Sequence, residues 1–231
     1  MSTILTFETL FGDRVRDSGA KFTTAQIDRA IVEAVKRYSR VRPVEAVQDY
    51  AGDGATFDFA LPTGWQQESS TIRAVEYPAG QRPASLLEPT DWEFYRSTTS
   101  VVKLRLKSIT PATGQTLRVT WTKPHVVDVS SSTIIAHDEE AVANLAAAIG
   151  LRQLAAHYAN TVDPTIQADS VNYRSKSSEY LKLAGELEQQ YREHLGIKAD
   201  GGETIAGGTF VDVDRTSSLN QDQLTHPNRW R

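Results

Sequence analysis

The residues from 136 to 160 bring together side chains that a hydrolytic metal site uses, in the sequence AHDEEAVANLAAAIGLRQLAAHYAN. His137 and Asp138 are adjacent, Glu139 and Glu140 follow them, and His157 comes 20 positions after His137. Imidazole nitrogens and carboxylate oxygens are the usual ligands of a catalytic metal ion. The stretch therefore has two interpretations, a metal-dependent phosphohydrolase site and the capped start of a buried helix.

The spacing of the histidines argues against the metal site. Such a site needs a histidine well upstream of the His-Asp pair, and the only one is His125, beside Pro124 at the end of a predicted strand. In a continuous helix 20 residues span about 30 Å, so His137 and His157 cannot share a metal ion. The HExxH spacing of zinc hydrolases is also absent. We therefore expect no catalytic residue, no metal site and no cofactor.

The helix interpretation accounts for the same residues. Asp138, Glu139 and Glu140 fall in a first turn, where free N–H groups and the helix dipole favour each carboxylate by about 0.3–1 kcal/mol. His137 or Asp138 is then the cap. The residues that follow are apolar around most of the helix, which predicts a central, buried position. A strip of small residues lets another backbone approach closely, within the subunit or from a neighbouring copy: Ala143, Ala147 and Gly150.

Composition excludes several classes of protein. The 231 residues contain no cysteine, which rules out disulfides, thiolate metal sites and cysteine nucleophiles. A formal net charge of -4 is unsuited to a general nucleic-acid binder. No stretch approaches the ~20 apolar residues of a membrane helix, and the N-terminus lacks the pattern of a signal peptide, so we expect a soluble, unexported chain without a membrane partner. Nucleotide-binding and serine-hydrolase glycine motifs are absent.

Hydrophobic periodicity predicts four helices. The first two cover about 3–16 and 24–40, and Arg42-Pro43 ends the second. Two more cover about 138–160 and 169–195, and Asp163-Pro164 between them predicts an antiparallel pair. The last helix has one apolar stripe, and the rest of its surface is polar. The stripe is formed by Tyr173, Ser177, Tyr180, Ala184, Leu187, Tyr191 and Leu195.

Between the helices the period changes to two. Strands are predicted on both sides of a turn at Gly52–Gly54 and at 71–78, 101–107 and 116–124, which is typical of an antiparallel barrel or sandwich. The predicted fold is α+β: a four-helix bundle, an antiparallel β domain inserted between helices two and three, and an extended C-terminal arm. The expected parts are residues 1–43, 44–135, 136–196 and 197–231.

The segment 197–231 is rich in Gly, Ser, Thr, Asp and Asn and cannot bury enough surface to fold alone. We expect it to be an arm that is ordered by another chain, the alternative being a flexible terminus. The alternation of Phe210, Val211 and Val213 suits addition of a strand to a neighbour's sheet. Trp230 between Arg229 and Arg231 suits an interface anchor.

Two further groups of residues have alternative interpretations. The basic cluster Lys36, Arg37, Arg40 and Arg42 complements the negative end of the second helix, or faces an acidic partner or passing DNA. The aromatic residues of the β insert supply its core and rim, or form a surface that recognises glycan or a host protein; the candidates for that surface are Trp65, Trp92 and Tyr95.

The order of segments resembles a known family. The chain begins with a helical segment that contains FTTAQIDRAIVEAVKRYSRVRP, and a β insert with DFALPTGW and AVEYP comes next. After the insert come two helical segments and a Gly-rich tail; the helical segments are STIIAHDEEAVANLAAAIGLRQLAAHYAN and ADSVNYRSKSSEYLKLAGELEQQYREHLG. This layout is similar to that of tailed-phage head-to-tail connector proteins, also called adaptor or head-completion proteins, over residues 1–196. The β insert departs from the smallest members, which look like helical bundles alone.

The resemblance implies a structural virion protein that is not an enzyme. Such proteins form a ring, usually twelve-fold, beneath the portal, extend a C-terminal arm onto it and offer the opposite face to the tail or neck, while DNA passes through the lumen. The protein would assemble in the host cytoplasm. Expected portal contacts are Phe210, Val211, Val213, Arg229, Trp230 and Arg231, and expected subunit-packing residues are Ala143, Ala147, Gly150, Tyr180, Leu187 and Tyr191. The alternative functions are a β-domain binding module for glycan or a host protein, and an HD-type metal hydrolase.

Overall fold

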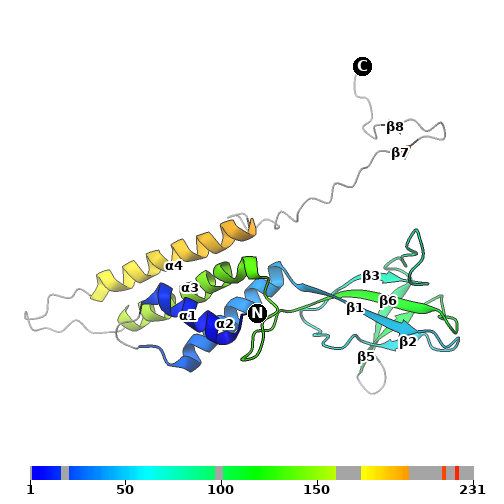
Figure 1. The fold of residues 1–231 in the computed structure, drawn as a ribbon, viewed down its shortest axis with the longest axis horizontal. Helices are drawn as coiled ribbons and strands as arrows, with labels where there is room; N and C mark the ends of the chain where they lie inside the picture. Colours follow the sequence, from blue (N-terminus) through cyan, green and yellow to red (C-terminus); the bar gives the residue numbers. More distant parts are fainter. Residues whose placement is uncertain are drawn as a thin grey trace, which may run out of the picture.

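A computed structural model describes residues 2–16, 21–96, 101–159 and 173–197, together with two short strands further on. The described residues form an α+β structure in which a helical lobe and a β lobe lie end to end (Figure 1). None of the described helices is long and apolar enough to cross a membrane. The helices are α1 (Ile4–Val15), α2 (Thr24–Val41), α3 (Glu139–Ala159) and α4 (Tyr173–Leu195). The α+β class, with two helices on each side of a β insert, is therefore confirmed.

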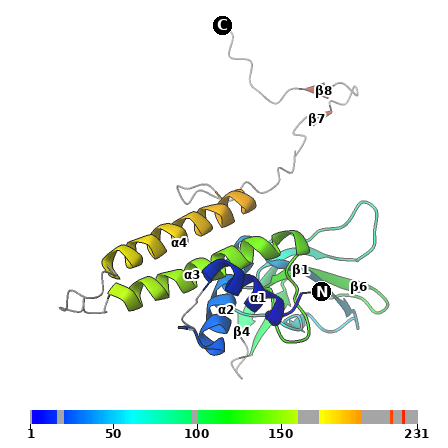
Figure 2. The ribbon, with the colours of Figure 1, turned by 60° about the vertical axis from the view of Figure 1, so that its left-hand side comes forward.

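The helix α3 is the centre of the helical lobe. It packs against α1, α2 and α4, and both views show it between α4 on one side and α1 with α2 on the other (Figures 1 and 2). Residues around its whole circumference are buried, including Val142, Leu145 and Leu151. The arrangement is thus a central helix covered by three others, which differs from a bundle with four equivalent positions.

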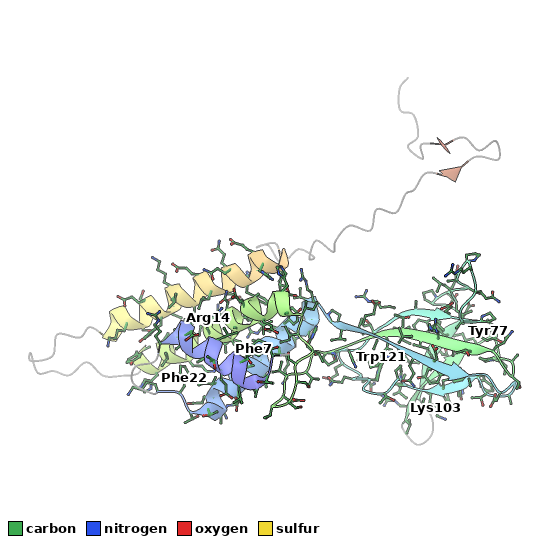
Figure 3. All side chains as sticks on the ribbon, viewed as in Figure 1. Phe7, Arg14, Phe22, Tyr77, Lys103 and Trp121 are labelled. Carbon is green, nitrogen blue, oxygen red and sulfur yellow. The ribbon has the colours of Figure 1, made fainter. Side chains whose placement is uncertain are left out.

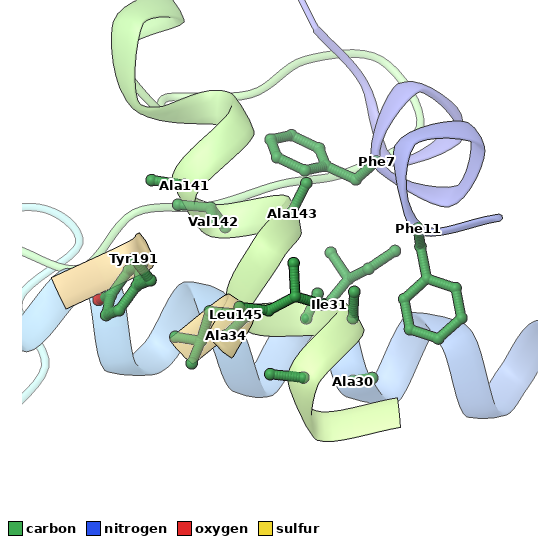
Figure 4. Packing of buried hydrophobic residues seen from close by; sticks show 14 of the residues in the cluster. Phe7, Phe11, Ala30, Ile31, Ala34, Ala141, Val142, Ala143, Leu145 and Tyr191 are labelled. Atoms are coloured by element: carbon green, nitrogen blue, oxygen red, sulfur yellow. The ribbon is translucent and has the colours of Figure 1, made fainter. Parts of the chain in front are cut away.

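The neighbouring helices cover α3 with apolar stripes. The stripe of α2 includes Ile31 and Ala34, which lie beside Leu145 in the core (Figure 4). On α1, Phe7 and Phe11 are buried, and Phe7 lies over Ala143 (Figure 4). Because alanines dominate the surface of α3, these large side chains fill the space that its small ones leave.

Gly150 of α3 faces the ring of Phe11. A Cβ atom added at Gly150 would lie 2.5 Å from Cζ and 2.7 Å from Cε2 of Phe11, closer than carbon atoms approach without a shift. Phe11 is itself buried and meets Phe22 edge to face, with ring centroids 5.5 Å apart. The glycine is therefore required by the close approach of α1.

The β lobe consists of two three-stranded antiparallel sheets, with strand orders β1-β6-β3 and β2-β5-β4. No closed barrel forms among its described strands, so of the two predicted architectures the barrel is wrong. Buried side chains from both sheets form one cluster: Phe59, Leu104 and Leu106 from one sheet, and Val75, Leu117, Val119 and Trp121 from the other. The strands are β1 (Val44–Ala51), β2 (Asp58–Ala60), β3 (Ile72–Glu76), β4 (Trp92–Arg96), β5 (Val102–Leu106) and β6 (Thr116–Lys123).

The turn at Gly52–Gly54 does not join a hairpin. β1 pairs with β6, and β2 pairs with β5, so the strands before and after this turn belong to different sheets. A Cβ atom at Gly52 would lie 2.4 Å from the carbonyl oxygen of Ala112, which explains the need for glycine here.

Side chains of the two lobes form separate sets, with Phe7 and Phe22 in one and Tyr77 and Trp121 in the other (Figure 3).

A loop after β6, residues 124–135, returns the chain to the helical lobe and packs there. Val127 and Ile134 join the helical core, and the backbone N–H of Ile4 donates to the carbonyl oxygen of Asp128 at 3.0 Å. Further along the chain, the two short strands β7 (Arg215–Thr216) and β8 (Asp222–Gln223) pair antiparallel with each other.

We predict that Gly150→Ala lowers the free energy of unfolding by about 1–3 kcal/mol, because the new methyl group overlaps the buried ring of Phe11. Alanine is the better helix former by about 0.5–1 kcal/mol, so the sign of the change tests the packing. The measurement is urea denaturation followed by circular dichroism.

The matched control is Gly185→Ala in α4, where a Cβ atom meets nothing within 4 Å. This substitution should raise the free energy of unfolding by about 0.5–1 kcal/mol. Equal stabilisation by both substitutions would show that α1 does not approach Gly150 as described.

Candidate functional site

Asp138 is the most connected polar residue where the two lobes meet, and it is fully buried. Its carboxylate accepts a hydrogen bond from Tyr38 Oη at 2.6 Å and from His194 Nε2 at 2.8 Å. Arg42 Nη1 lies 2.9 Å from one carboxylate oxygen and 3.1 Å from the other. One side chain thereby connects α2, the start of α3 and the last turn of α4.

This arrangement corrects the prediction that Asp138 belongs to the N-terminal cap. A short 3-10 turn, η1 (Ala136–Asp138), precedes α3, and the carboxylate of Asp138 points to side chains of α2 and α4. Glu139 and Glu140 occupy the first turn, and Glu139 accepts a hydrogen bond from Ser2 Oγ at 2.5 Å. The favourable dipole position is therefore left to the two glutamates.

The donors around Asp138 keep it ionised. Burial alone raises its pKa, but hydrogen bonds from Tyr38, His194 and Arg42 and the positive charge of Arg42 outweigh that effect, so its pKa lies below the ordinary value. Burial and the bond to Asp138 raise the pKa of Tyr38. Nearby, burial raises the pKa of Tyr191 to about 12, and its hydroxyl oxygen has no partner among the described residues. These tyrosines stay neutral, so Asp138 carries the negative charge of the cluster.

His125 connects the same cluster to the loop that leaves the β lobe. Its backbone N–H donates to Ser39 Oγ at 2.9 Å, and its ring nitrogens lie 2.8 Å from the carbonyl oxygen of Arg42 and 2.9 Å from that of Thr133. The ring packs on Tyr38, with centroids 4.8 Å apart. Burial lowers the pKa of His125, since it disfavours the charged ring. His125 is thus a buried structural residue.

One group of possible metal ligands occurs in the described part of the chain: His137, Asp138 and His194, with ligand atoms within 4.8 Å of one another. Sequence reasoning tested His125 and His157 as partners of the pair and missed His194, which comes from the far end of α4. The rings of His137 and His194 lie close, with centroids 4.7 Å apart. Both oxygens of Asp138 already contact Arg42, so a cation would have to displace a guanidinium group. The geometry fits a buried ion pair with supporting hydrogen bonds better than a metal centre. We call this set, Asp138 with Tyr38, Arg42 and His194, the latch.

The predicted subunit-packing residues lie largely inside the chain's own core. Ala143, Ala147, Leu187 and Tyr191 are buried there, as is Gly150. Tyr180 is half-buried and stacks on Tyr158 with ring centroids 5.6 Å apart. Contacts with another subunit would therefore have to be made by exposed residues around this set.

The predicted arm residues Phe210, Val211, Val213, Arg229, Trp230 and Arg231 lie outside the described residues. Their role in portal binding stays a prediction.

The aromatic residues considered for glycan binding do not share one surface. Trp65 packs against Phe94 at 5.4 Å and Trp121 at 5.7 Å between ring centroids, and Trp92 meets Phe94 at 5.8 Å. Tyr95 lies on the other face of β4, because successive residues of a strand alternate. There Arg105 covers the Tyr95 ring at 3.5 Å from its centroid. The aromatic residues thus fit the core-and-rim interpretation.

No protein-family model and no curated protein matches the sequence. Among solved structures, a chain from the neck of an empty GTA particle computed with C6 symmetry aligns with a TM-score of 0.29 and 13% identity, over 75% of this chain and 87% of that one. A chain from the neck of a native GTA particle computed with C12 symmetry aligns with a TM-score of 0.26 and 12% identity, over 78% and 92%. TM-scores of this size do not establish a shared fold.

We predict that Asp138→Asn lowers the free energy of unfolding by about 2–4 kcal/mol, because Arg42 and His194 lose their shared acceptor charge. The control is Glu140→Gln, an exposed neighbour in the first turn of α3, which should cost under about 1 kcal/mol. Denaturant unfolding of the three proteins provides the comparison. Similar losses for both variants would contradict the latch.

The lowered pKa of Asp138 predicts a pH dependence. A carboxylate with a lowered pKa in the folded state stabilises that state above the ordinary pKa of about 3.9, and this contribution is lost as the pH falls through the lowered value. The difference in unfolding free energy between the natural protein and Asp138→Asn should therefore shrink between about pH 5 and pH 3. A difference that stays constant over this range would show that Asp138 is not ionised in the folded protein.

Proposed function

We propose that this chain is a structural subunit of a tailed-phage neck, a head-to-tail adaptor without enzymatic activity. In the proposed assembly, copies of the chain form a ring of twelve beneath the portal. The C-terminal arm binds the portal, the opposite face receives the tail or neck, and DNA passes through the lumen. The proposed location is the head–tail interface of the virion.

The observation that carries the proposal is the order of the elements. Two helices, six strands and two more helices follow one another, and 34 residues then remain after Ile197 in a chain of 231. This is the order on which the resemblance to connector proteins rests. The two neck chains come from the same part of a particle, but their similarity is too low to add support.

The described surface supplies candidates for lateral contact between subunits. The helix α4 packs against α3 with Ala184, Leu187 and Tyr191, while Leu181 and Leu183 of the same helix are exposed. Exposed leucines on a packed helix suit a further helix from a neighbouring copy. Leu181 and Leu183 are two positions apart and so lie on opposite flanks of the buried stripe. We therefore assign lateral packing to the exposed flanks of α4 and leave the buried stripe to the subunit's own core.

The net charge is compatible with a lumen that DNA traverses. A chain with a formal net charge of -4 does not hold a polyanion by charge alone. The arm, by contrast, ends in Arg229, Trp230 and Arg231, which suits an anchor in a pocket with an acidic rim.

We predict that deletion of residues 198–231 abolishes binding to the portal protein encoded with this chain and leaves the helical signal of the monomer unchanged. The cut follows Ile197, because this residue packs against the helical core. Binding is measured by co-migration in size-exclusion chromatography with light scattering, which also gives the mass of the complex.

The matched control replaces Arg229, Trp230 and Arg231 with alanine in the full-length chain. This variant should bind the portal more weakly than the natural protein and more strongly than the truncated one. Undiminished portal binding by the truncated protein would refute the role of the arm in portal binding. A complex whose mass excludes a ring of copies would refute the proposed adaptor function.

A further inference from the structure

A groove of about 1060 Å³ lies where the helical lobe meets the β lobe. One wall is the C-terminal half of α2, with Lys36 and Arg40. The other wall is the turn before β3 together with its first residues, including Glu68 and Arg73. Val41 and Pro43 also line the groove, at the point where α2 runs into β1. Figure 1 shows this connection between the helical lobe and the β lobe.

The cations of this groove differ from others on the same helix. Arg37 pairs with Glu33 at 3.0 Å, and Arg42 pairs with Asp138 at 2.9 Å. Lys36, Arg40 and Arg73 have no ion pair or hydrogen bond with any other described residue. Lys36 and Arg40 are four positions apart and so project from the same side of α2. The predicted basic cluster is thus divided, and two of its members remain available for a partner.

Arg73 lines the groove at an irregularity in its strand. The register between β3 and β6 shifts between Ile72 and Ala74, so Arg73 has no opposite residue in the ladder. Such irregularities change the direction of a side chain. Arg73 therefore adds a third exposed positive charge, against the single carboxylate of Glu68.

Hydrogen bonds hold both walls of the groove in place. Ser39 Oγ accepts the backbone N–H of His125 at 2.9 Å. Behind the other wall, the backbone N–H of Thr122 donates to the carbonyl oxygen of Thr71 at 2.9 Å, and Thr71 donates its N–H to Thr122 Oγ1 at 3.1 Å. A groove that exists before binding requires little ordering, which favours affinity.

The lining favours a peptide over nucleic acid. Three cations and one carboxylate give a small positive excess, whereas DNA binders commonly neutralise about 6–10 phosphates. Val41, Pro43 and Pro124 add apolar surface, and Gln66 and Gln67 add amides that match a peptide backbone. We propose that this groove binds an extended acidic peptide segment of a partner protein, whose carboxylates pair with Lys36, Arg40 and Arg73.

The inference concerns the monomer and holds whether or not the chain forms a ring. The probe is a fluorescein-labelled synthetic peptide of alternating Asp and Val, and its control has Asn at each Asp. Anisotropy titrations of the full-length protein should show binding of the Asp peptide about tenfold tighter than binding of the Asn peptide.

The variant Lys36→Gln, Arg40→Gln, Arg73→Gln should weaken binding of the Asp peptide about tenfold. All three side chains are exposed, so the variant is expected to fold. The matched control is Lys103→Gln, Lys107→Gln, Lys182→Gln, which removes the same charge outside the groove and should change affinity less than about twofold.

Three results would overturn the proposal. If both triple variants weakened binding of the Asp peptide equally, binding would reflect general attraction between opposite charges and not the groove. Tighter binding of a labelled DNA duplex than of the Asp peptide at the same salt, lost in the groove variant, would assign the groove to nucleic acid. Equal binding of the Asp peptide and the Asn peptide by the natural protein would show that the groove does not recognise carboxylates.

Discussion

The apolar circumference of α3 is the constraint on which the rest of the helical lobe depends. A helix without a polar side is stable in water only when other elements cover it on every side. Its surface is largely alanine, so each residue buries little area and the neighbours must come close to gain from contact. The positions of α1, α2 and α4 follow from this need (Figure 2). Phe11 reaches furthest in, and Gly150 makes room for it.

Close packing does not by itself determine how the helices are aligned along their axes, and Asp138 adds that specification. A carboxylate without solvent contact has to be surrounded by donors, which here come from Tyr38, Arg42 and His194. Sliding α2 or α4 along α3 by one turn would separate these groups. The backbone carbonyl of Arg42 meanwhile contacts His125, so the same residue connects the helices with the chain that returns from the β lobe.

Periodicity predicted the elements that present a regular pattern. The predicted helices at 3–16, 24–40 and 138–160 match α1, α2 and α3 within two residues, because each is covered on a definite face. The strand β4 (Trp92–Arg96) was missed, since its aromatic residues conceal the alternation of a strand, and β1 and β2 were not assigned to separate sheets. At the candidate site the pair His137-Asp138 was singled out from the sequence, with a metal site and a helix cap as its two interpretations. Its actual partners, Tyr38 and His194, are distant in sequence, and no local pattern connects them.

The pairing of Val44 with Lys123 at the base of the β lobe has an architectural consequence. The chain enters and leaves the lobe through neighbouring residues, so a short turn between them would close the gap without moving a helix. The loop that follows would keep its place, because His125 and Ile134 pack on the helical lobe. The chain therefore passes out to the β lobe and back at one place, and the covalent path of the helical lobe does not run through the two sheets.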